Sequence, residues 1–210
     1  MNLEYYGQIF EANTVAEAMP VILTAEDSTP QERWIKETPY LGEMAVSKLG
    51  INANSLVLDF GCGVGRNAKE LISRTGCLVV GVDTSLSYRS LASHYVNSDR
   101  FIACHPNALD VFPRFDACLA VWVLQHVHDL SGCVKSISDS LAPDGRLLLV
   151  NNNARVIPFK RGDELGWADD KQDVFGVLGD GLKETETGPL SPEIVGAQVA
   201  DFAHWAVYQK

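Results

Sequence analysis

The middle of the chain alternates between two hydrophobic periodicities. Short, unbroken apolar runs such as 55–58 have the pattern of strands that are buried on both faces. Between these runs, apolar residues recur every three or four positions, as at Val64, Ala68 and Leu71, which is the pattern of one helix face. Strands are expected over 55–58, 77–82, 101–104, 117–124 and 146–150. Strands that alternate with helices predict a parallel, doubly wound α/β sheet with right-handed crossovers.

The two flanks carry weaker patterns. Thr38 and Pro39 are the residue types of a helix N-cap and first helical position, so a helix is expected from there to Leu49. The first 30 residues show no core pattern and are expected to form a lid or a mobile arm. The apolar stretch 202–208 predicts a last strand, antiparallel to the rest.

Composition and charge narrow the class of protein. The chain has 210 residues, 46% hydrophobic, which suits one domain with a core and is too apolar for a disordered chain. Its net charge of −10 argues against a nucleic-acid partner, because binding to a phosphate backbone depends mainly on Lys and Arg. The five cysteines contain no CxxC pair and fit neither a disulfide framework nor a zinc ribbon. No signal peptide or membrane span is expected, which favours a cytoplasmic protein.

A glycine-rich stretch, DFGCGVG over 59–65, joins the first of these strands to a helix. Alternating glycines let the backbone turn sharply and let a ligand approach closely, and the helix N-terminus beyond them offers unpaired N–H groups. The next strand ends at Asp83, about 20 residues beyond Gly63, where a carboxylate can accept both hydroxyl hydrogens of a ribose. These features predict a site for an adenosine-containing cofactor at the strand ends.

Two classes of cofactor fit this stretch. Residues 63–68 match G-x-G-x-x-A, the fingerprint of a dinucleotide such as NAD. Residues 59–65 match D-x-G-x-G-x-G, in which an acid ends the strand. A carboxylate at Asp59 would repel a pyrophosphate and attract a sulfonium, so the residues favour S-adenosylmethionine over NAD.

Four motifs in order resemble the class I S-adenosylmethionine-dependent methyltransferase family. Residues 57–66 are similar to the family's first motif, and 80–85 to its second strand with the ribose-binding acid. Residues 115–127 resemble its fourth strand and the loop that follows. Residues 141–147 resemble its L-x-P-G-G-x-L turn, with Asp144 in place of the first glycine.

The resemblance implies which residues hold the cofactor. The glycine loop would cradle its methionine part and Asp83 its ribose, while Asn107 stands where the family usually has an acid for the adenine amino group. The residues implied for cofactor binding are Asp59, Gly61, Cys62, Gly63, Gly65, Asp83, Thr84, Ser85, Asn107, Ala108, Val121 and Trp122. A single domain is expected, with an N-terminal cap or arm over 1–39, a cofactor-binding core over 40–152 and a C-terminal part over 153–210 that contributes to the acceptor site.

Four residues are candidates for acting on the methyl acceptor. His126 follows the fourth strand, where it could remove a proton from the acceptor or only orient it. Trp34 could line the acceptor pocket or pin its segment to the core. Arg66 could contact the substrate or the carboxylate of the cofactor, or be a surface side chain. Arg155 could bind a carboxylate or phosphate on the substrate or lie in a solvated loop. His126 and His128 have no second ligand cluster elsewhere in the sequence, so no metal site is expected.

The sequence therefore predicts methyl transfer from S-adenosylmethionine to a small molecule by in-line displacement, with a protein acceptor as the second option. The protein would mainly align and desolvate the reactants. Two other readings stay open: a non-catalytic protein that binds the cofactor as a sensor or partner subunit, and an NAD-dependent oxidoreductase.

Overall fold

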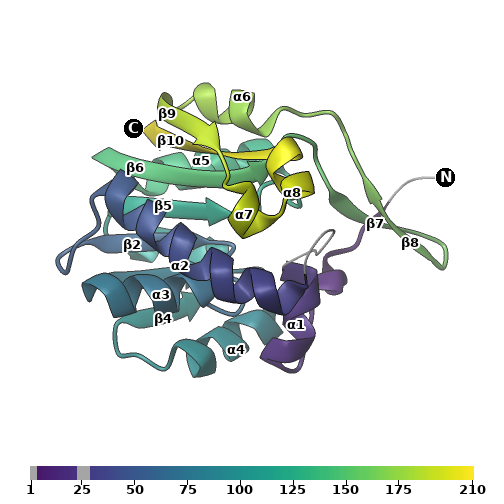
Figure 1. Ribbon diagram of the computed structural model, residues 1–210, viewed down its shortest axis with the longest axis horizontal. Helices are drawn as coiled ribbons and strands as arrows, with labels where there is room; N and C mark the ends of the chain where they lie inside the picture. The colour runs from purple at the N-terminus through teal and green to yellow at the C-terminus, as the bar shows by residue number, and fades with distance from the viewer. Residues whose placement is uncertain (1–3, 23–28) are drawn as a thin grey trace.

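The protein is built around one seven-stranded sheet with helices on both faces (Figure 1). The computed structural model describes residues 4–22 and 29–210. The strand order is β4-β3-β2-β5-β6-β10-β9, with β10 antiparallel to both of its neighbours and the pairs from β4 to β6 parallel. The strands are β2 (Leu56–Phe60), β3 (Leu78–Val82), β4 (Phe101–Cys104), β5 (Phe115–Val121), β6 (Leu141–Asn152), β9 (Lys183–Pro189) and β10 (Ala203–Gln209). The predicted fold class, including the antiparallel last strand, is confirmed.

Each parallel strand sends alternate side chains into two separate cores. Val57 and Leu148 belong to the core that packs under one set of helices, while their neighbours Leu58 and Leu149 belong to the core on the opposite face. This double burial explains the unbroken apolar runs. The first set of helices comprises α2 (Pro30–Leu49), α3 (Arg66–Thr75), α4 (Leu86–Val96), α7 (Pro192–Val195) and α8 (Ala197–Phe202), and the second comprises η2 (Pro106–Val111), α5 (Leu130–Ser140) and α6 (Val174–Gly179).

Helix α2 begins nine residues earlier than the sequence pattern predicted. Thr29 is its N-cap, and Thr29 and Glu32 form a reciprocal capping box with N···O distances of 3.0 and 3.2 Å. The expected start at Thr38–Pro39 is therefore wrong, and Pro39 lies inside the helix. The pattern was misleading because the first two turns bury charged residues, Arg33 and Glu37, where a helix usually buries apolar ones.

A second, three-stranded sheet lies beside the carboxyl ends of the large sheet's parallel strands. It pairs β1 (Glu4–Tyr5) with β7 (Ile157–Arg161), and β7 with β8 (Glu164–Ala168), all antiparallel. Figure 1 shows the β7–β8 hairpin projecting away from the large sheet. Two more elements, η1 (Gly7–Phe10) and α1 (Val15–Ile22), follow β1.

The described part of the first 30 residues is packed against the fold. Ala12 and Ala18 are buried in a small core with Val64 and Tyr88 of the glycine loop and α4. The predicted lid or arm falls partly on residues 1–3 and 23–28, which lie outside the described residues. None of the described helices has the length and apolar character needed to cross a membrane.

Candidate active site

A cavity of about 430 Å³ lies at the carboxyl ends of the central parallel strands. Eight of the twelve residues predicted for cofactor binding are in its wall: Gly61, Cys62, Gly63, Asp83, Thr84, Asn107, Val121 and Trp122. They come from the segments that follow β2, β3, β4 and β5, which are neighbours in the sheet. Residues from four separate parts of the chain thus converge on one space, as expected at the switch point of a doubly wound sheet.

The glycine loop has a backbone that other residues rarely adopt. Gly61, Gly63 and Gly65 have φ angles of 73°, 52° and 80°, all in the left-handed region. The Gly61 N–H donates to the Val82 carbonyl at 2.8 Å, so the loop is tied to the end of β3. A Cβ atom on Gly61 would lie 2.2 Å from the Val123 side chain, which leaves no room for a larger residue.

Asp83 presents its carboxylate to this loop and to the cavity. Its Oδ2 accepts a hydrogen bond from the Gly63 N–H at 3.0 Å, and its Oδ1 accepts one from the Ser85 N–H at 2.9 Å. Burial raises the pKa of Asp83, and these two hydrogen bonds oppose the shift. Each oxygen keeps further acceptor capacity, so the carboxylate can still receive two ribose hydroxyls.

Asp59 lies beneath the glycine loop, outside the cavity wall. Only 1% of it is exposed, and its Oδ2 has no hydrogen-bond partner among the described residues. Burial raises its pKa to about 7, against the opposing charge of Arg66 and a hydrogen bond from the Ala68 backbone. Asp59 therefore stands at the end of β2, as predicted, but it does not line the cavity. Any effect of its charge on a ligand would be indirect, across the glycine loop.

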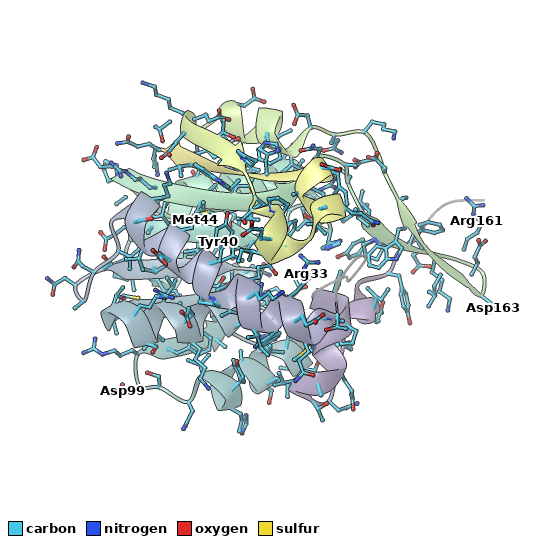
Figure 2. All side chains as sticks on the ribbon, in the orientation of Figure 1. Arg33, Tyr40, Met44, Asp99, Arg161 and Asp163 are labelled. Carbon is cyan, nitrogen blue, oxygen red and sulfur yellow. The ribbon has the colours of Figure 1, made fainter. Side chains whose placement is uncertain are left out.

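Glu37, which the sequence analysis did not single out, organises one end of the cavity. Its fully buried carboxylate accepts hydrogen bonds from the Trp122 indole at 2.8 Å, from Arg66 at 3.3 Å and from Arg33 at 3.5 Å. Trp122 holds a left-handed backbone with φ of 56°, which this anchoring supports. Figure 2 shows Arg33 projecting from α2. The signal that could have revealed Glu37 is its i, i+4 spacing from Arg33.

His126 lies in the cavity wall as a neutral imidazole. Its Nδ1–H donates to the Val156 carbonyl at 2.7 Å, which leaves Nε2 as the acceptor, 3.2 Å from the Gln125 side-chain nitrogen. Burial lowers the pKa of His126 to about 4. Nε2 is thus an unprotonated, weakly basic acceptor at neutral pH, and it could accept a hydrogen bond from a ligand in place of the Gln125 amide.

Two of the candidates for substrate binding lie outside the wall. Arg155 is 2% exposed, and it donates to the carbonyls of Leu124 and Val127 at 2.5 Å and to Asp170 at 3.3 Å. Its charge is directed into the protein, where it holds the loop that carries His126. Trp34 packs edge-on against Tyr95, with ring centroids 5.9 Å apart.

The other predicted site residues also lie partly inside and partly outside the cavity wall. Arg66 is in the wall, whereas Gly65, Ser85 and Ala108 are outside it. Ser85 caps α4 by accepting the Tyr88 N–H at 3.1 Å. The wall also contains residues that the sequence analysis did not assign to the site, among them Tyr5, Phe10, Asn67, Tyr88 and Cys133. Within 4–22 and 29–210, no group of three or more His, Cys, Asp or Glu side chains is arranged to hold a metal ion.

Fold and site together define an α/β protein with a nucleotide-cofactor site at the ends of its parallel strands. Residues 58–149 match the family model described as a methyltransferase domain. This match supports the class I S-adenosylmethionine-dependent methyltransferase family, which the order of the motifs indicated.

Relatives with known names are similar over parts of the chain. A ubiquinone biosynthesis O-methyltransferase from Bradyrhizobium diazoefficiens is 32% identical over 127 residues, covering 54% of this chain and 49% of the relative. Polyketide synthase ThaQ from Burkholderia thailandensis is 29% identical over 71% of this chain and 7% of its own length. The magnesium protoporphyrin IX methyltransferase of Synechocystis PCC 6803 has the same fold, with a TM-score of 0.64, 16% identity, and coverage of 94% and 95%. The chain thus spans about half the length, or less, of these curated relatives.

Proposed function

We propose that this protein transfers a methyl group from S-adenosylmethionine to a small-molecule acceptor. The observation that carries the proposal is the convergence on one cavity of eight of the twelve residues that the resemblance implied for the cofactor. The names of relatives that act in ubiquinone and polyketide biosynthesis support a small-molecule acceptor. A location in the cytoplasm stays a prediction from the sequence.

The residues of the cavity fit the cofactor in three places. The Asp83 carboxylate can accept hydrogen bonds from the ribose hydroxyls, and the Asn107 side-chain carbonyl can accept one from the adenine amino group. At the other end, the left-handed Gly61 and Gly63 have no side chain to keep the methionine part away from the backbone, and Trp122 lies in the same wall. The cofactor would supply a methyl group that is already activated on a cationic sulfur. The protein's part is then to align the acceptor and to exclude water.

Calorimetry with S-adenosylmethionine, S-adenosylhomocysteine and NAD tests the cofactor class. We expect binding of the first two and none of NAD. Binding of NAD alone would contradict the proposal. A scintillation assay with methyl-labelled S-adenosylmethionine and pooled small-molecule extracts then tests for transfer. A protein that binds the cofactor but labels no compound would be a non-catalytic binder.

A further inference from the structure

Three aromatic rings from distant parts of the chain lie together at the β5 end of the cavity. Phe10 and His126 are in the cavity wall, and Trp167 lies against both of them outside the wall. We call Phe10, His126 and Trp167 the ring cluster. Their ring centroids are 5.4 Å apart for Phe10 and His126, 5.6 Å for His126 and Trp167, and 6.4 Å for Phe10 and Trp167. All three pairs are tilted, within the range of favourable aromatic contacts.

The ring cluster lies on the opposite side of the cavity from the groups assigned to the nucleoside. Asp83 follows β3 and Asn107 follows β4, whereas His126 follows β5, and β2 separates β3 from β5 in the sheet. The other two rings come from η1 and from the β7–β8 hairpin. A ligand that contacts the ring cluster would therefore lie beyond the nucleoside, where an acceptor has to approach the methyl group.

The rings keep surface available for such a ligand. Trp167 is 46% exposed, and Phe10 and His126 are half-buried. A flat ligand ring that packs on the exposed part of Trp167 would remove apolar area from water, which favours binding. The cluster thus offers a ligand ring both contact area and the edge-to-face geometry that aromatic pairs prefer.

The charges around the cavity disfavour an anionic ligand. Among the described residues, Arg66 is the one Lys or Arg in the wall, and the Glu37 carboxylate pairs with it at 3.3 Å. Asp83 and Asp129 add two carboxylates to the wall. The residues outside the described part, 1–3 and 23–28, contain no Lys or Arg. Arg155 lies behind the wall near His126, but it is held by the Leu124 and Val127 carbonyls and by Asp170. A phosphate or carboxylate on the acceptor would thus meet two wall carboxylates, and the one cation of the wall is already paired with Glu37.

The two basic residues of the β7–β8 hairpin, Lys160 and Arg161, add no positive charge to the cavity wall. Lys160 Nζ lies 5.6 Å from the centre of the Tyr6 ring, and Arg161 lies over the Phe159 ring at 5.9 Å. Neither is in the cavity wall. Figure 2 shows Arg161 near the far end of the hairpin, close to Asp163.

We infer that the methyl acceptor is an aromatic compound that carries a hydroxyl group and no anionic group, with its ring packed against Phe10, His126 and Trp167. This inference rests on the proposed function. In the transfer, the acceptor oxygen bonds to the methyl carbon with a lone pair, and the S–C bond breaks with its electrons remaining on sulfur. As the O–C bond forms, the hydroxyl becomes acidic enough to pass its proton to the weakly basic Nε2 of His126, which gives up its long contact with the Gln125 amide.

Three matched probes test the inference on the complete protein saturated with S-adenosylhomocysteine. They are 4-ethylphenol, 4-ethylcyclohexanol and 3-(4-hydroxyphenyl)propanoate, and their dissociation constants can be measured by calorimetry or ligand-observed NMR. We expect 4-ethylphenol to bind about fivefold more tightly than its saturated counterpart. It should bind about tenfold more tightly than the carboxylate.

Variants connect this preference to the ring cluster. Trp167→Leu, a change outside the cavity wall, should weaken 4-ethylphenol binding about fivefold and leave S-adenosylhomocysteine affinity unchanged. Phe10→Leu should weaken 4-ethylphenol binding by a similar factor. Leu165→Ala is the control, because Leu165 is 53% exposed on the same strand as Trp167 and is not part of the cluster. It should change neither affinity, and circular dichroism checks that each variant is folded.

The outcomes separate the inference from the proposed function. Equal affinities for the three probes, or ring-cluster variants that bind 4-ethylphenol like wild type, overturn the inference while the cofactor assignment stands. Failure of the wild-type protein to bind S-adenosylhomocysteine overturns both.

Discussion

At the scale of single residues, two buried acids set the electrostatics of the site in different ways. Asp83 faces the cavity and already accepts two backbone N–H groups, which fix the direction of its remaining lone pairs. Asp59 is enclosed beneath the loop and has an oxygen with no partner among the described residues. Both positions follow from the sequence motif, because each acid stands at or next to a strand end. Their difference in surroundings follows only from the structure.

Replacing Asp83 by Ala should weaken S-adenosylhomocysteine binding strongly. The change removes charge-assisted hydrogen bonds to the ribose, worth about 1.5–3 kcal/mol each, and frees the Gly63 N–H from its partner. We expect an affinity loss of roughly tenfold to a hundredfold by calorimetry. Asp99→Ala is the control, because Asp99 is exposed in the loop between α4 and β4 and is not in the cavity wall (Figure 2). An unchanged affinity of Asp83→Ala would remove Asp83 from the cofactor site.

Asp59 should make stability depend on pH. Its pKa is raised to about 7 in the folded state, so between its ordinary value near 4 and about 7 the folded protein binds more protons than the unfolded chain. The contribution of Asp59 to the free energy of unfolding must then decrease as pH rises through this window. We expect wild type to lose stability relative to Asp59→Asn between pH 4.5 and pH 7.5, measured by urea denaturation at both values. A constant difference would contradict the shift.

At the scale of elements, the structure separates what hydrophobic pattern can reveal from what it cannot. The parallel strands were predictable because each is buried on both faces, as Leu58 and Val57 show. The first two turns of α2 were not, because they bury the pair Arg33 and Glu37 and so have the pattern of a solvated segment. The β7–β8 hairpin pairs locally across Gly162 and Asp163, and it was missed because its strands are mostly half-buried or exposed and carry no apolar run. Its pairing with β1 joins segments about 150 residues apart, so no local pattern predicts that pairing.

The capping box at the start of α2 should contribute measurably to stability. Thr29→Ala removes the oxygen that accepts the Glu32 N–H, and we expect a loss of about 1 kcal/mol in the free energy of unfolding. Glu32→Gln is the matched control, because glutamine can also accept the Thr29 N–H and complete the box. Urea denaturation compares the variants. Equal stability of Thr29→Ala and wild type would show that the helix does not depend on this cap.

At the scale of the whole molecule, the site is assembled by segments from both ends of the chain around the central cofactor loops. The glycine loop, Asp83 and Trp122 belong to the middle of the sequence and were found by their motifs. Phe10 and Trp167 come from flanks without a motif; Phe10 lies in the cavity wall, and Trp167 of the second sheet packs against it. Sequence motifs therefore predict the cofactor-binding residues better than those proposed for the acceptor, because the proposed acceptor residues are brought together by pairing between distant segments.

Arg155 is the residue through which the C-terminal part acts on the loop after β5. Its guanidinium joins the carbonyls of Leu124 and Val127 to Asp170, and the Val156 carbonyl beside it receives the His126 Nδ1–H. Arg155→Met leaves two buried carbonyls without their donors, so we expect a loss of about 2 kcal/mol or more in the free energy of unfolding. Because the same loop carries His126, methyl transfer should fall further than S-adenosylhomocysteine affinity.

Two further variants distinguish positioning by Arg155 from general destabilisation. Asp170→Asn removes only the partly exposed carboxylate, whose side chain is 31% exposed, and it should cost much less stability than Arg155→Met. Arg155→Lys keeps the charge but lacks the planar fork that reaches two carbonyls at once, so it should restore little of the turnover. If Arg155→Lys transferred methyl groups as fast as wild type, the charge alone would suffice. The two hydrogen bonds from Arg155 to the Leu124 and Val127 carbonyls would then not be what aligns His126 with the acceptor.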